Sequence, residues 1–581
     1  MKIAIASILS QLVLFAAGRM DSLSTPLSLP AITYNVISLV PQNQSMGVIV
    51  DGQFYPLDTV NEASFLLHSG QAPRAEKGYS YAIVEKESPS NIVDQESFLR
   101  DPMTIGDATL NEYYNRSWNS MKLAQIPQIM EPLPIIHRLN NNLHIDGEIP
   151  TIHIVGNQSA IDYLHQNSVE DININGINVT YISPNDIKTF YNVSFAIAGH
   201  STRSRPKLSY KIEIGKENTN QDKDLYGHRQ FKLRAMYADA SYMRDELAYK
   251  ITESIGLPSS QHSYARVYIN GQAVGLFGVA EIFKTQWIKN VFNNGEEFEN
   301  GALYEATLGA FRRERRPGEP PRKRPGGREP REAPSDLSYL GPNLTVYKGY
   351  YPDKGHASKV VGANYTKIME FTKFISEQPN MTATVDDSFA PLWEEKIDVT
   401  SFLRALALEI VISNCDAYLT MATNYVLYDD RTTGRLVMTE QDFDLTMGNT
   451  FYEPELMYNG NYSLFPGMVQ RPLSSRLLKV PKFRQEFERL ILNMTEFLVN
   501  PTVLGPRIND LYNFLKEDVA WDKSLPRLGP KKPSSGPRLR PDIPFDTAVN
   551  GNTGDMRHLA LKEWVELRSK NTLDFFKQSA T

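Results

Sequence analysis

The sequence predicts an α+β protein whose N-terminal part is β-rich and whose C-terminal part is helical. Between residues 30 and 86, short strand-like segments are separated by turn residues such as Asp51-Gly52, a pattern typical of a small β-sandwich. After residue 470, apolar residues recur at helical spacing over residues 472–498, 502–516 and 557–576. At 581 residues the chain is long enough for several domains and a large buried core.

The first 18 residues have the features of a secretory signal peptide. Lys2 supplies the positive charge, residues 3–15 are mostly apolar, and the small residues Ala16-Ala17-Gly18 offer a cleavage site. Asn-x-Ser/Thr sequons such as Asn43 and Asn115 recur along the chain and fit an exported protein. We therefore expect a secreted, extracellular protein with no transmembrane span, and an uncleaved N-terminal anchor is the alternative.

Charge and cysteine content narrow the possible partners and the redox chemistry. The net charge of −6 gives no reason to expect nucleic acid as a partner. Cys415 is the only cysteine, so the chain cannot form an intrachain disulfide, and a large core does not need one. No histidine lies near Cys415 in the sequence, which favours a small packed residue over a nucleophile.

The chain after the β-rich part divides into a linker and a second domain. Residues 87–146 are rich in Pro and Asn and are predicted to be a linker. Residues 147–578 form the second domain. Two inserts, 311–336 and 526–544, interrupt this domain with dense Pro, Gly and basic residues, a composition that predicts disorder.

The second domain contains an ordered set of oxygen-bearing side chains. Asp398 is a plausible N-cap for a helix that ends near Asn414, which places Asp416 on the loop beyond it. Residues 424–428 and 435–438 read as a hairpin that begins at Asn424. Its far end returns the chain at Asp442-Phe443-Asp444 beside Asp416. Phosphoryl transfer needs such carboxylates and amides, although an isolated Asp-x-Asp more often caps a turn.

A second candidate region lies upstream, between predicted strands at residues 193–198 and 208–214. The loop that begins at Gly199 contains small, hydroxylated and basic residues, including Ser201, and is suited to lie over phosphates. A basic hairpin turn is the alternative. Lys211 and Lys232 lie in predicted strands that flank this loop, where a lysine is commonly a solvated edge residue.

Several motifs in this region resemble the spore coat protein H (CotH) kinase family, found in bacterial spore coats and on the surfaces of mucoralean fungi. They occur in the family's order and cover most of residues 190–450. The segments that carry the resemblance are Phe231-Lys232-Leu233-Arg234, Arg244-Asp245-Glu246-Leu247-Ala248-Tyr249, Arg266-Val267-Tyr268-Ile269-Asn270-Gly271, Gly275-Leu276-Phe277, Asn414-Cys415-Asp416-Ala417-Tyr418 and Asp442-Phe443-Asp444-Leu445-Thr446-Met447-Gly448.

The resemblance implies an atypical protein-kinase-like domain with a helical C-lobe, and it assigns roles to the candidate residues. Asp416 would be the catalytic base, and Asn424 with Asp444, or Asp442 as the alternate, would bind Mg²⁺ or Mn²⁺. Either Lys211 or Lys232, together with Gly199 and Ser201, would hold the ATP phosphates. Glu246 would pair with that lysine, and Glu281 would mark the hinge near adenine.

The function implied by the resemblance is transfer of the ATP γ-phosphate to Ser or Thr of secreted, coat or wall proteins, at the cell wall or spore surface. Two alternatives stay open: an adhesin or invasin that binds a host cell-surface receptor, and a structural spore-coat protein. The chain departs from bacterial members at Cys415, where Trp is common, and at Met447, where Phe is frequent. The ionisable site residues are all present.

Overall fold

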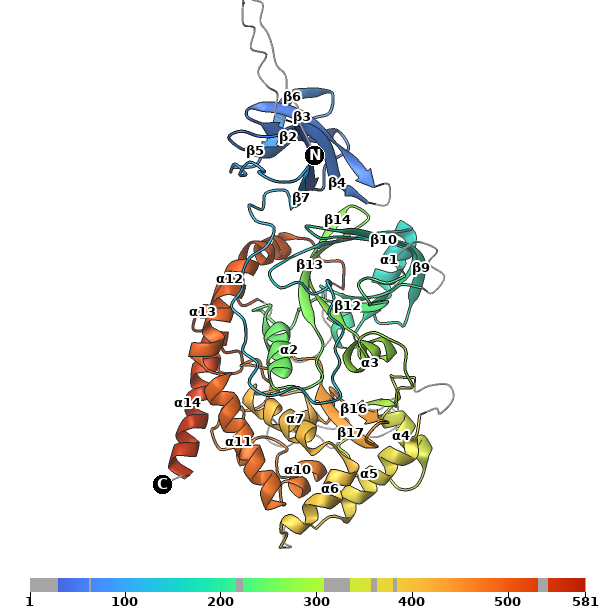
Figure 1. Cartoon of the computed structure of the whole chain (residues 1–581), viewed down its shortest axis with the longest axis vertical. Coiled ribbons are helices and arrows are strands. Elements are labelled where there is room, and N and C mark those ends of the chain that lie inside the picture. Colours follow the sequence, from blue (N-terminus) through green and yellow to red (C-terminus); the bar gives the residue numbers. More distant parts are fainter. Residues whose placement is uncertain are drawn as a thin grey trace, which may run out of the picture. The chain divides into compact units, whose positions relative to one another are not determined.

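The computed structural model describes residues 30–61, 64–199, 201–215, 223–307, 335–356, 363–379, 384–530 and 542–579 (Figure 1). The expected signal peptide at 1–18 lies outside these ranges. So do residues 311–334 of the first predicted insert and residues 531–541 of the second. The chain forms two compact units, one made of residues up to Val36 with Val40–Asp58 and His68–Thr109, the other of Ile37–Leu39, Thr59–Leu67 and the chain from Leu110 onward.

The N-terminal strands, in the region where the sequence predicted a small β-sandwich, are hydrogen-bonded in the order β6-β5-β2-β3-β4-β1-β7. The positive φ angles of Asp51 and Gly52 form the tight turn between β2 and β3. Two strands fall in the predicted linker; every residue of one of them, β6, is exposed, so it shows no apolar alternation. The strands are β1 (Ala31–Ile37), β2 (Gln44–Val50), β3 (Gln53–Asn61), β4 (Ser64–Pro73), β5 (Tyr79–Glu85), β6 (Ser88–Gln95) and β7 (Ala108–Tyr113).

The larger unit begins with a closed barrel that the sequence did not predict. Its strand order is β10-β11-β12-β14-β13-β8-β9, and it closes through the parallel pairing of β8 with β13. Alternate residues such as Tyr210, Ile212, Phe231 and Leu233 fill its interior. The strands are β8 (Thr151–Val155), β9 (Asn173–Ile182), β10 (Ile187–Ala198), β11 (Ser209–Glu213), β12 (Gln230–Arg234), β13 (His262–Ile269) and β14 (Gln272–Glu281), and the helix α1 (Gln158–Gln166) packs on β9 and β10.

A small sheet and a set of helices complete this unit. The predicted hairpin is present as β16 (Tyr425–Asp430) and β17 (Arg435–Glu440), and β15 (Leu303–Glu305) pairs with β16. The helices that bear on the site are α2 (Arg244–Ser254), α7 (Val399–Val411) and α8 (Tyr418–Met421). The others are α3 (Thr285–Phe292), α4 (Leu344–Tyr350), α5 (Tyr365–Glu377), α6 (Ala390–Lys396), α9 (Pro454–Met457), α10 (Pro472–Leu477), α11 (Pro481–Phe497), α12 (Pro501–Ser524), α13 (Phe545–Asn550) and α14 (Leu561–Ser579).

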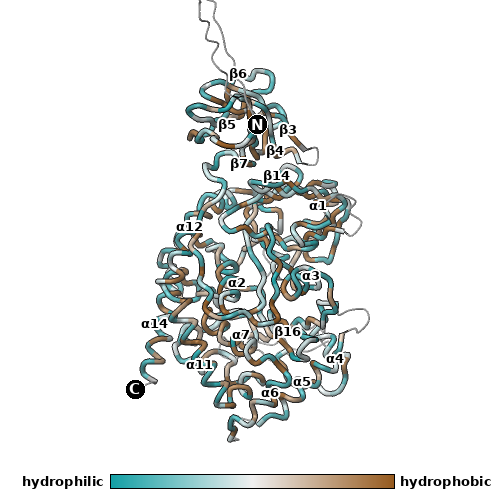
Figure 2. Tube along the Cα trace, viewed as in Figure 1, coloured by the Kyte–Doolittle hydropathy of each residue, from teal (hydrophilic) through white to brown (hydrophobic). Residues whose placement is uncertain are grey.

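The C-terminal helices follow the amphipathic pattern expected from the sequence. In α11 the buried residues Phe483, Phe487, Leu490 and Met494 recur at helical spacing on one face. Figure 2 shows the same pattern as alternating brown and teal bands along α11 and α14. In the described part of the chain, no helix combines the length and the apolar character that a membrane crossing requires. The α+β class is confirmed.

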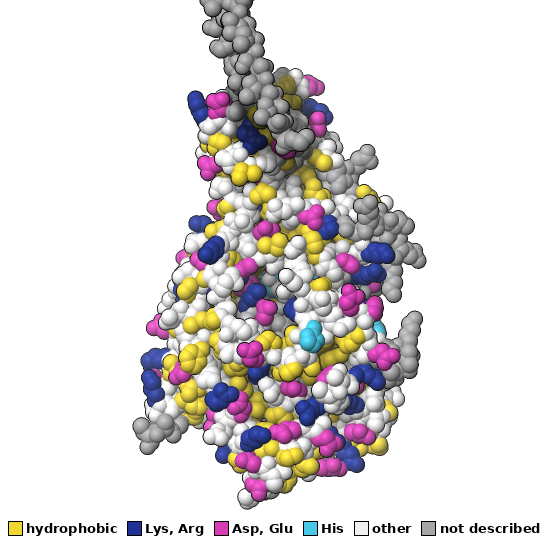
Figure 3. Space-filling view, in the orientation of Figure 1, with side chains coloured by type: hydrophobic (Ala, Val, Ile, Leu, Met, Phe, Trp, Pro, Cys, Tyr) yellow, Lys and Arg dark blue, Asp and Glu magenta, His cyan; other side chains and the backbone are white. Residues whose placement is uncertain are grey.

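Basic and acidic side chains are interspersed over the face of the molecule that Figure 3 displays, with apolar side chains between them. This mixture agrees with a net charge of only −6 in a chain with 61 basic and 67 acidic residues. Any charge-based recognition therefore depends on local groups.

Candidate active site

A cleft of about 1270 Å³ opens between the outer face of the barrel and the loops that follow α7 and β17. One wall is formed by the loop between β10 and β11 and by residues of β11, β12 and β14. The opposite wall is formed by the polar loops around the β16–β17 hairpin. Eight predicted site residues line this one cleft: Gly199, Lys211, Lys232, Glu281, Asp416, Asn424, Asp442 and Asp444.

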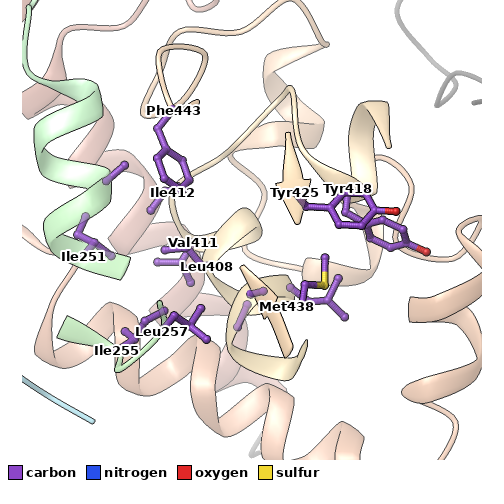
Figure 4. Close-up of a cluster of buried hydrophobic side chains, with 14 of the residues drawn as sticks. Ile251, Ile255, Leu257, Leu408, Val411, Ile412, Tyr418, Tyr425, Met438 and Phe443 are labelled. Carbon is purple, nitrogen blue, oxygen red and sulfur yellow. The ribbon is translucent and has the colours of Figure 1, made fainter. Parts of the chain in front are cut away.

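Asp416 is held at the cleft by a rigid helix and a short turn. The Asp398 carboxylate caps α7 by accepting the amide of Ser401 at 2.7 Å, as predicted. The C-terminal end of α7 is embedded in an apolar cluster that includes Leu408 and Val411 (Figure 4). After α7 the chain turns away, and the half-buried Asp416 follows on the loop. The buried helix thus fixes the base of this loop.

Asn424 lies beside Asp416 at the entrance of the β16–β17 hairpin. Its Nδ2 donates to the Asp416 carbonyl at 2.8 Å and to Asp416 Oδ2 at 3.0 Å. Asn424 has a φ of 55°, which asparagine tolerates better than most residues. These two bonds orient the amide, and among the described residues its Oδ1 has no hydrogen-bond partner. That oxygen is available to a ligand in the cleft.

Asp442 and Asp444 reach the cleft from the loop after β17, and an arginine from the barrel meets them. Arg234 Nη2 lies 2.6 Å from Asp442 Oδ1 and 3.5 Å from Asp444 Oδ2, and its Nε lies 2.6 Å from Asp245 Oδ2. Burial raises the pKa of Asp444 well above its usual range, and the charge of Asp442 raises it further, while Arg234 opposes both. The balance of these effects favours the protonated form of Asp444, and a cation beside the two carboxylates would favour the charged form.

The barrel wall supplies positive charge opposite these carboxylates. Lys211 and Lys232 are direct cross-strand neighbours on β11 and β12, and both point outward because the alternate positions fill the barrel. Lys211 forms a 2.7 Å ion pair with Glu213, whereas Lys232 has no hydrogen-bond or ion-pair partner among the described residues. Burial lowers the pKa of Lys232, and Arg234 lowers it further. Like charges placed opposite one another are unfavourable unless an anion lies near them.

The loop that begins at Gly199 adopts a shape that requires glycine. Gly199 has a φ of +86°, and a side chain there would collide with Thr202. Arg203 Nε donates to the Gly199 carbonyl at 2.6 Å, which ties the loop back on itself. Ser201 begins a short 3₁₀ helix, η1 (Ser201–Ser204), and its side chain lies outside the described part of the structure.

The role predicted for Glu246 is wrong, whereas the hinge position predicted at Glu281 stays a prediction. Glu246 does not line the cleft; it is buried against α12, where it forms an ion pair with Arg507, so it cannot hold a strand lysine. Glu281 lines the cleft, but its carboxylate is bound by Arg138 and by His228 Nε2 at 3.0 Å. Burial alone would raise the pKa of Glu281, yet these two partners keep it well below its usual range. Only the backbone near Glu281 is available to a ligand.

Sequence reasoning missed Arg234 and Asp245 as site residues. Both belong to the segments that carry the family resemblance, but the roles predicted from the sequence fall on their neighbours Lys232 and Glu246. The available signal was strand alternation: Arg234 is two residues after Lys232, so both must share the outer face of β12.

Within the described ranges, no group of three His, Cys, Asp or Glu side chains is arranged to hold a metal ion. Mg²⁺ does not require such a cage, because it commonly binds one or two carboxylates and fills its shell with water and substrate phosphates. The Asn424 oxygen, which has no partner among the described residues, and the neighbouring carboxylates of Asp442 and Asp444 fit that mode of binding, because a bound cation would favour their charged forms. The residues present are therefore compatible with Mg²⁺ or Mn²⁺.

Comparisons with known proteins agree with the motifs. The family model described as CotH kinase protein matches residues 195–570. The chain is 27% identical over 513 residues to Invasin CotH3 of Rhizopus delemar, covering 86% of this chain and 76% of that protein. It is 27% identical over 448 residues to Invasin CotH2 of the same fungus (75% and 68%), and 22% identical over 332 residues to Inner spore coat protein H of Bacillus subtilis (57% and 78%). The predicted resemblance is confirmed, and the chain belongs to the CotH kinase family.

Proposed function

We propose that this chain is a secreted protein kinase that transfers the γ-phosphate of ATP to a Ser or Thr hydroxyl of coat, wall or other secreted proteins. One observation carries the proposal: a single cleft brings Asp416, Asn424, Asp442 and Asp444 opposite Lys232. Carboxylates and an amide facing an unpartnered lysine are the groups that phosphoryl transfer requires. The family membership supports the same reaction class.

Asp416 is the proposed base. Its carboxylate accepts the proton of the acceptor hydroxyl while the hydroxyl oxygen bonds to the γ-phosphorus and the bond from that phosphorus to the β-phosphate oxygen breaks, leaving ADP. The amide of Asn424, at 3.0 Å from Asp416 Oδ2, orients the carboxylate toward the cleft. Such a site acts through position and charge and needs no covalent intermediate.

Lys232 is the better candidate of the two lysines for contacting the phosphates. Lys211 is already neutralised by Glu213, and Lys232 lies closer to the carboxylate side of the cleft, where Asp442, Asp245 and Asp444 influence its pKa. The backbone of the Gly199 loop is proposed to cover the phosphates. Lys211 would add to the positive field as the cross-strand neighbour.

Mg²⁺ or Mn²⁺, when bound, would neutralise the charge of the phosphates. Asn424 Oδ1 and Asp444 are the proposed ligands, with Asp442 as the alternate. The Arg234 contact at 3.5 Å from Asp444 is long enough to yield to a ligand, whereas its 2.6 Å bond to Asp245 holds the arginine on the barrel side.

Asp416→Ala and Asp444→Ala test the proposal directly. Purified protein with Mg²⁺ or Mn²⁺ and labelled ATP should phosphorylate itself or a casein-like acceptor, and each substitution should lower the rate at least 100-fold, since a general base contributes about 10²- to 10⁴-fold. Glu496→Ala, which removes an exposed carboxylate on α11 that does not line the cleft, is the control. Equal labelling by the parent and both variants would exclude the assignment.

A second candidate function is binding of a host cell-surface receptor, favoured by the names of the Rhizopus relatives, which are called invasins. Location on a spore or cell surface would suit both functions. Saturable binding of the labelled chain to host cells, retained by Asp416→Ala and accompanied by no phosphorylation, would favour this candidate over the kinase.

A further inference from the structure

Asp416 is anchored from behind by a buried asparagine. The Asn414 side chain is fully buried, and its Oδ1 accepts the backbone amide of Asp416 at 3.0 Å. The backbone amide of Asn414 donates in turn to the Glu409 carbonyl at 2.8 Å, which joins this turn to the end of α7. The backbone position of Asp416 therefore depends on which way the Asn414 amide faces.

Glu440 completes that arrangement. The backbone amide of Asp416 can only donate, so the Asn414 oxygen faces Asp416, and the Asn414 Nδ2 donates to Glu440 Oε2 at 3.2 Å. Glu440 is fully buried at the last position of β17, and within the described ranges its second oxygen has no partner. A buried acidic side chain with so little compensation is costly and calls for a function.

A second buried glutamate holds the chain on the other side of Asp416. Both carboxylate oxygens of Glu409 accept the amide of Leu419, at 2.7 and 2.9 Å, and one also accepts the amide of Thr420 at 3.2 Å. These are the free amides at the start of α8, the short helix that follows Asp416-Ala417. The Asp416 loop is thus fastened upstream through Glu440 and downstream through Glu409.

We propose that Glu440 and Glu409 are positioning residues that set the place of the Asp416 carboxylate, Glu440 through Asn414 and Glu409 through the start of α8. This inference rests on the proposed kinase function. Neither glutamate lines the cleft, so neither touches a substrate. Glu440 also ends the strand that leads into Asp442, and the next amide, of Gln441, donates to the Asn424 carbonyl at 2.8 Å. One buried position therefore connects the base, the hairpin and the Asp-x-Asp loop.

The test compares Glu440→Leu with Glu440→Gln in the full chain. Leucine removes the acceptor for Asn414, whereas the glutamine carbonyl replaces it at nearly the same size. We expect Glu440→Leu to lower kcat about 100-fold with the KM for ATP changed less than about threefold, because a displaced base impairs the chemical step. Glu440→Gln should recover at least a third of the parent kcat. Glu488→Leu is the matched control. It removes a half-buried glutamate on α11 that accepts a hydrogen bond from the Tyr462 hydroxyl.

Hydrogen exchange of the peptide spanning residues 413–421 gives a readout that does not depend on activity. The amides of this peptide should exchange at least tenfold faster in Glu440→Leu and at the parental rate in Glu440→Gln. If Glu440→Leu is insoluble, Asn414→Ala replaces it. A parental kcat in Glu440→Leu, or equal exchange in all variants, would overturn the proposal. If the parent shows no kinase activity, the proposed function fails, and the exchange result alone decides the positioning role.

Discussion

At the scale of single residues, the cations of the site differ in whether they have an ion-pair partner. Arg234 pairs with Asp442 and Asp245, and Lys211 pairs with Glu213, so both of these cations have partners within the protein. Lys232 has no such partner in the described part of the chain. A half-buried charge without a partner is unfavourable, and an anionic ligand would compensate it.

Substitution of the two lysines should therefore give unequal effects. Lys232→Met should lower kcat/KM for ATP at least 30-fold, because it removes the uncompensated cation, whereas Lys211→Met should lower it less than about fivefold. Steady-state phosphorylation at varied ATP concentration measures both. Equal losses would mean that the two lysines act together, and a larger loss in Lys211→Met would reverse the assignment.

Glu409 predicts a dependence of stability on pH. Burial raises its pKa from 4.5 to about 8, although the amides of Leu419 and Thr420 oppose this shift. Between these two values the folded state keeps a proton that the unfolded chain releases, so stability falls as pH rises from about 5 to 8 and then levels off. Glu409→Gln should lack this component, so its Tm relative to the parent should rise over that interval. A constant difference in Tm from pH 5 to pH 9 would contradict the assignment.

At the scale of elements, α2 shows that one position along a helix decides which neighbour a side chain contacts. The sequence predicted that Glu246 pairs with a strand lysine, and the structure places Glu246 on α2 (Arg244–Ser254). Successive residues on a helix are about 100° apart, so a shift of one position changes the neighbour completely. Asp245 faces β12 and pairs with Arg234, whereas Glu246 faces α12 and pairs with Arg507.

The Glu246–Arg507 pair should therefore contribute to stability and not to phosphate binding. Arg507→Met leaves Glu246 buried without its partner, and we expect a loss of about 3 kcal/mol in the free energy of unfolding. Adding Glu246→Leu should recover more than half of that loss, because the unpaired charge is gone. Denaturant unfolding of the two variants measures the coupling. If kcat falls in these variants while the free energy of unfolding is unchanged, Glu246 acts in the site after all.

At the scale of the whole molecule, local sequence patterns predicted helices, caps and hairpins. They did not predict the barrel, whose closure depends on segments far apart in the sequence. The Asp398 cap, the β16–β17 hairpin and the C-terminal helices follow from turn chemistry and helical spacing, and all are confirmed. The barrel is different, because it closes by pairing Thr151 on β8 with Arg266 on β13, more than a hundred residues apart. No short-range pattern specifies such a pairing, and the outward row of Lys211, Lys232 and Arg234 becomes visible only once the barrel is closed.

Because the cleft is formed by both the barrel and the hairpin loops, a ligand that contacts both should stabilise the larger unit as a whole. We expect Mg²⁺ with a non-hydrolysable ATP analogue, present at about 100 times the Kd, to stabilise the folded state by about 2.7 kcal/mol and so raise the Tm by several degrees. Asp444→Ala and Lys232→Met act on opposite walls, and each should abolish most of this rise while leaving the ligand-free Tm within about 2 °C of the parent. Differential scanning fluorimetry with and without Mg²⁺ separates the metal from the nucleotide. An equal rise in all three proteins would place the nucleotide elsewhere, because only a ligand that spans the cleft depends on both walls.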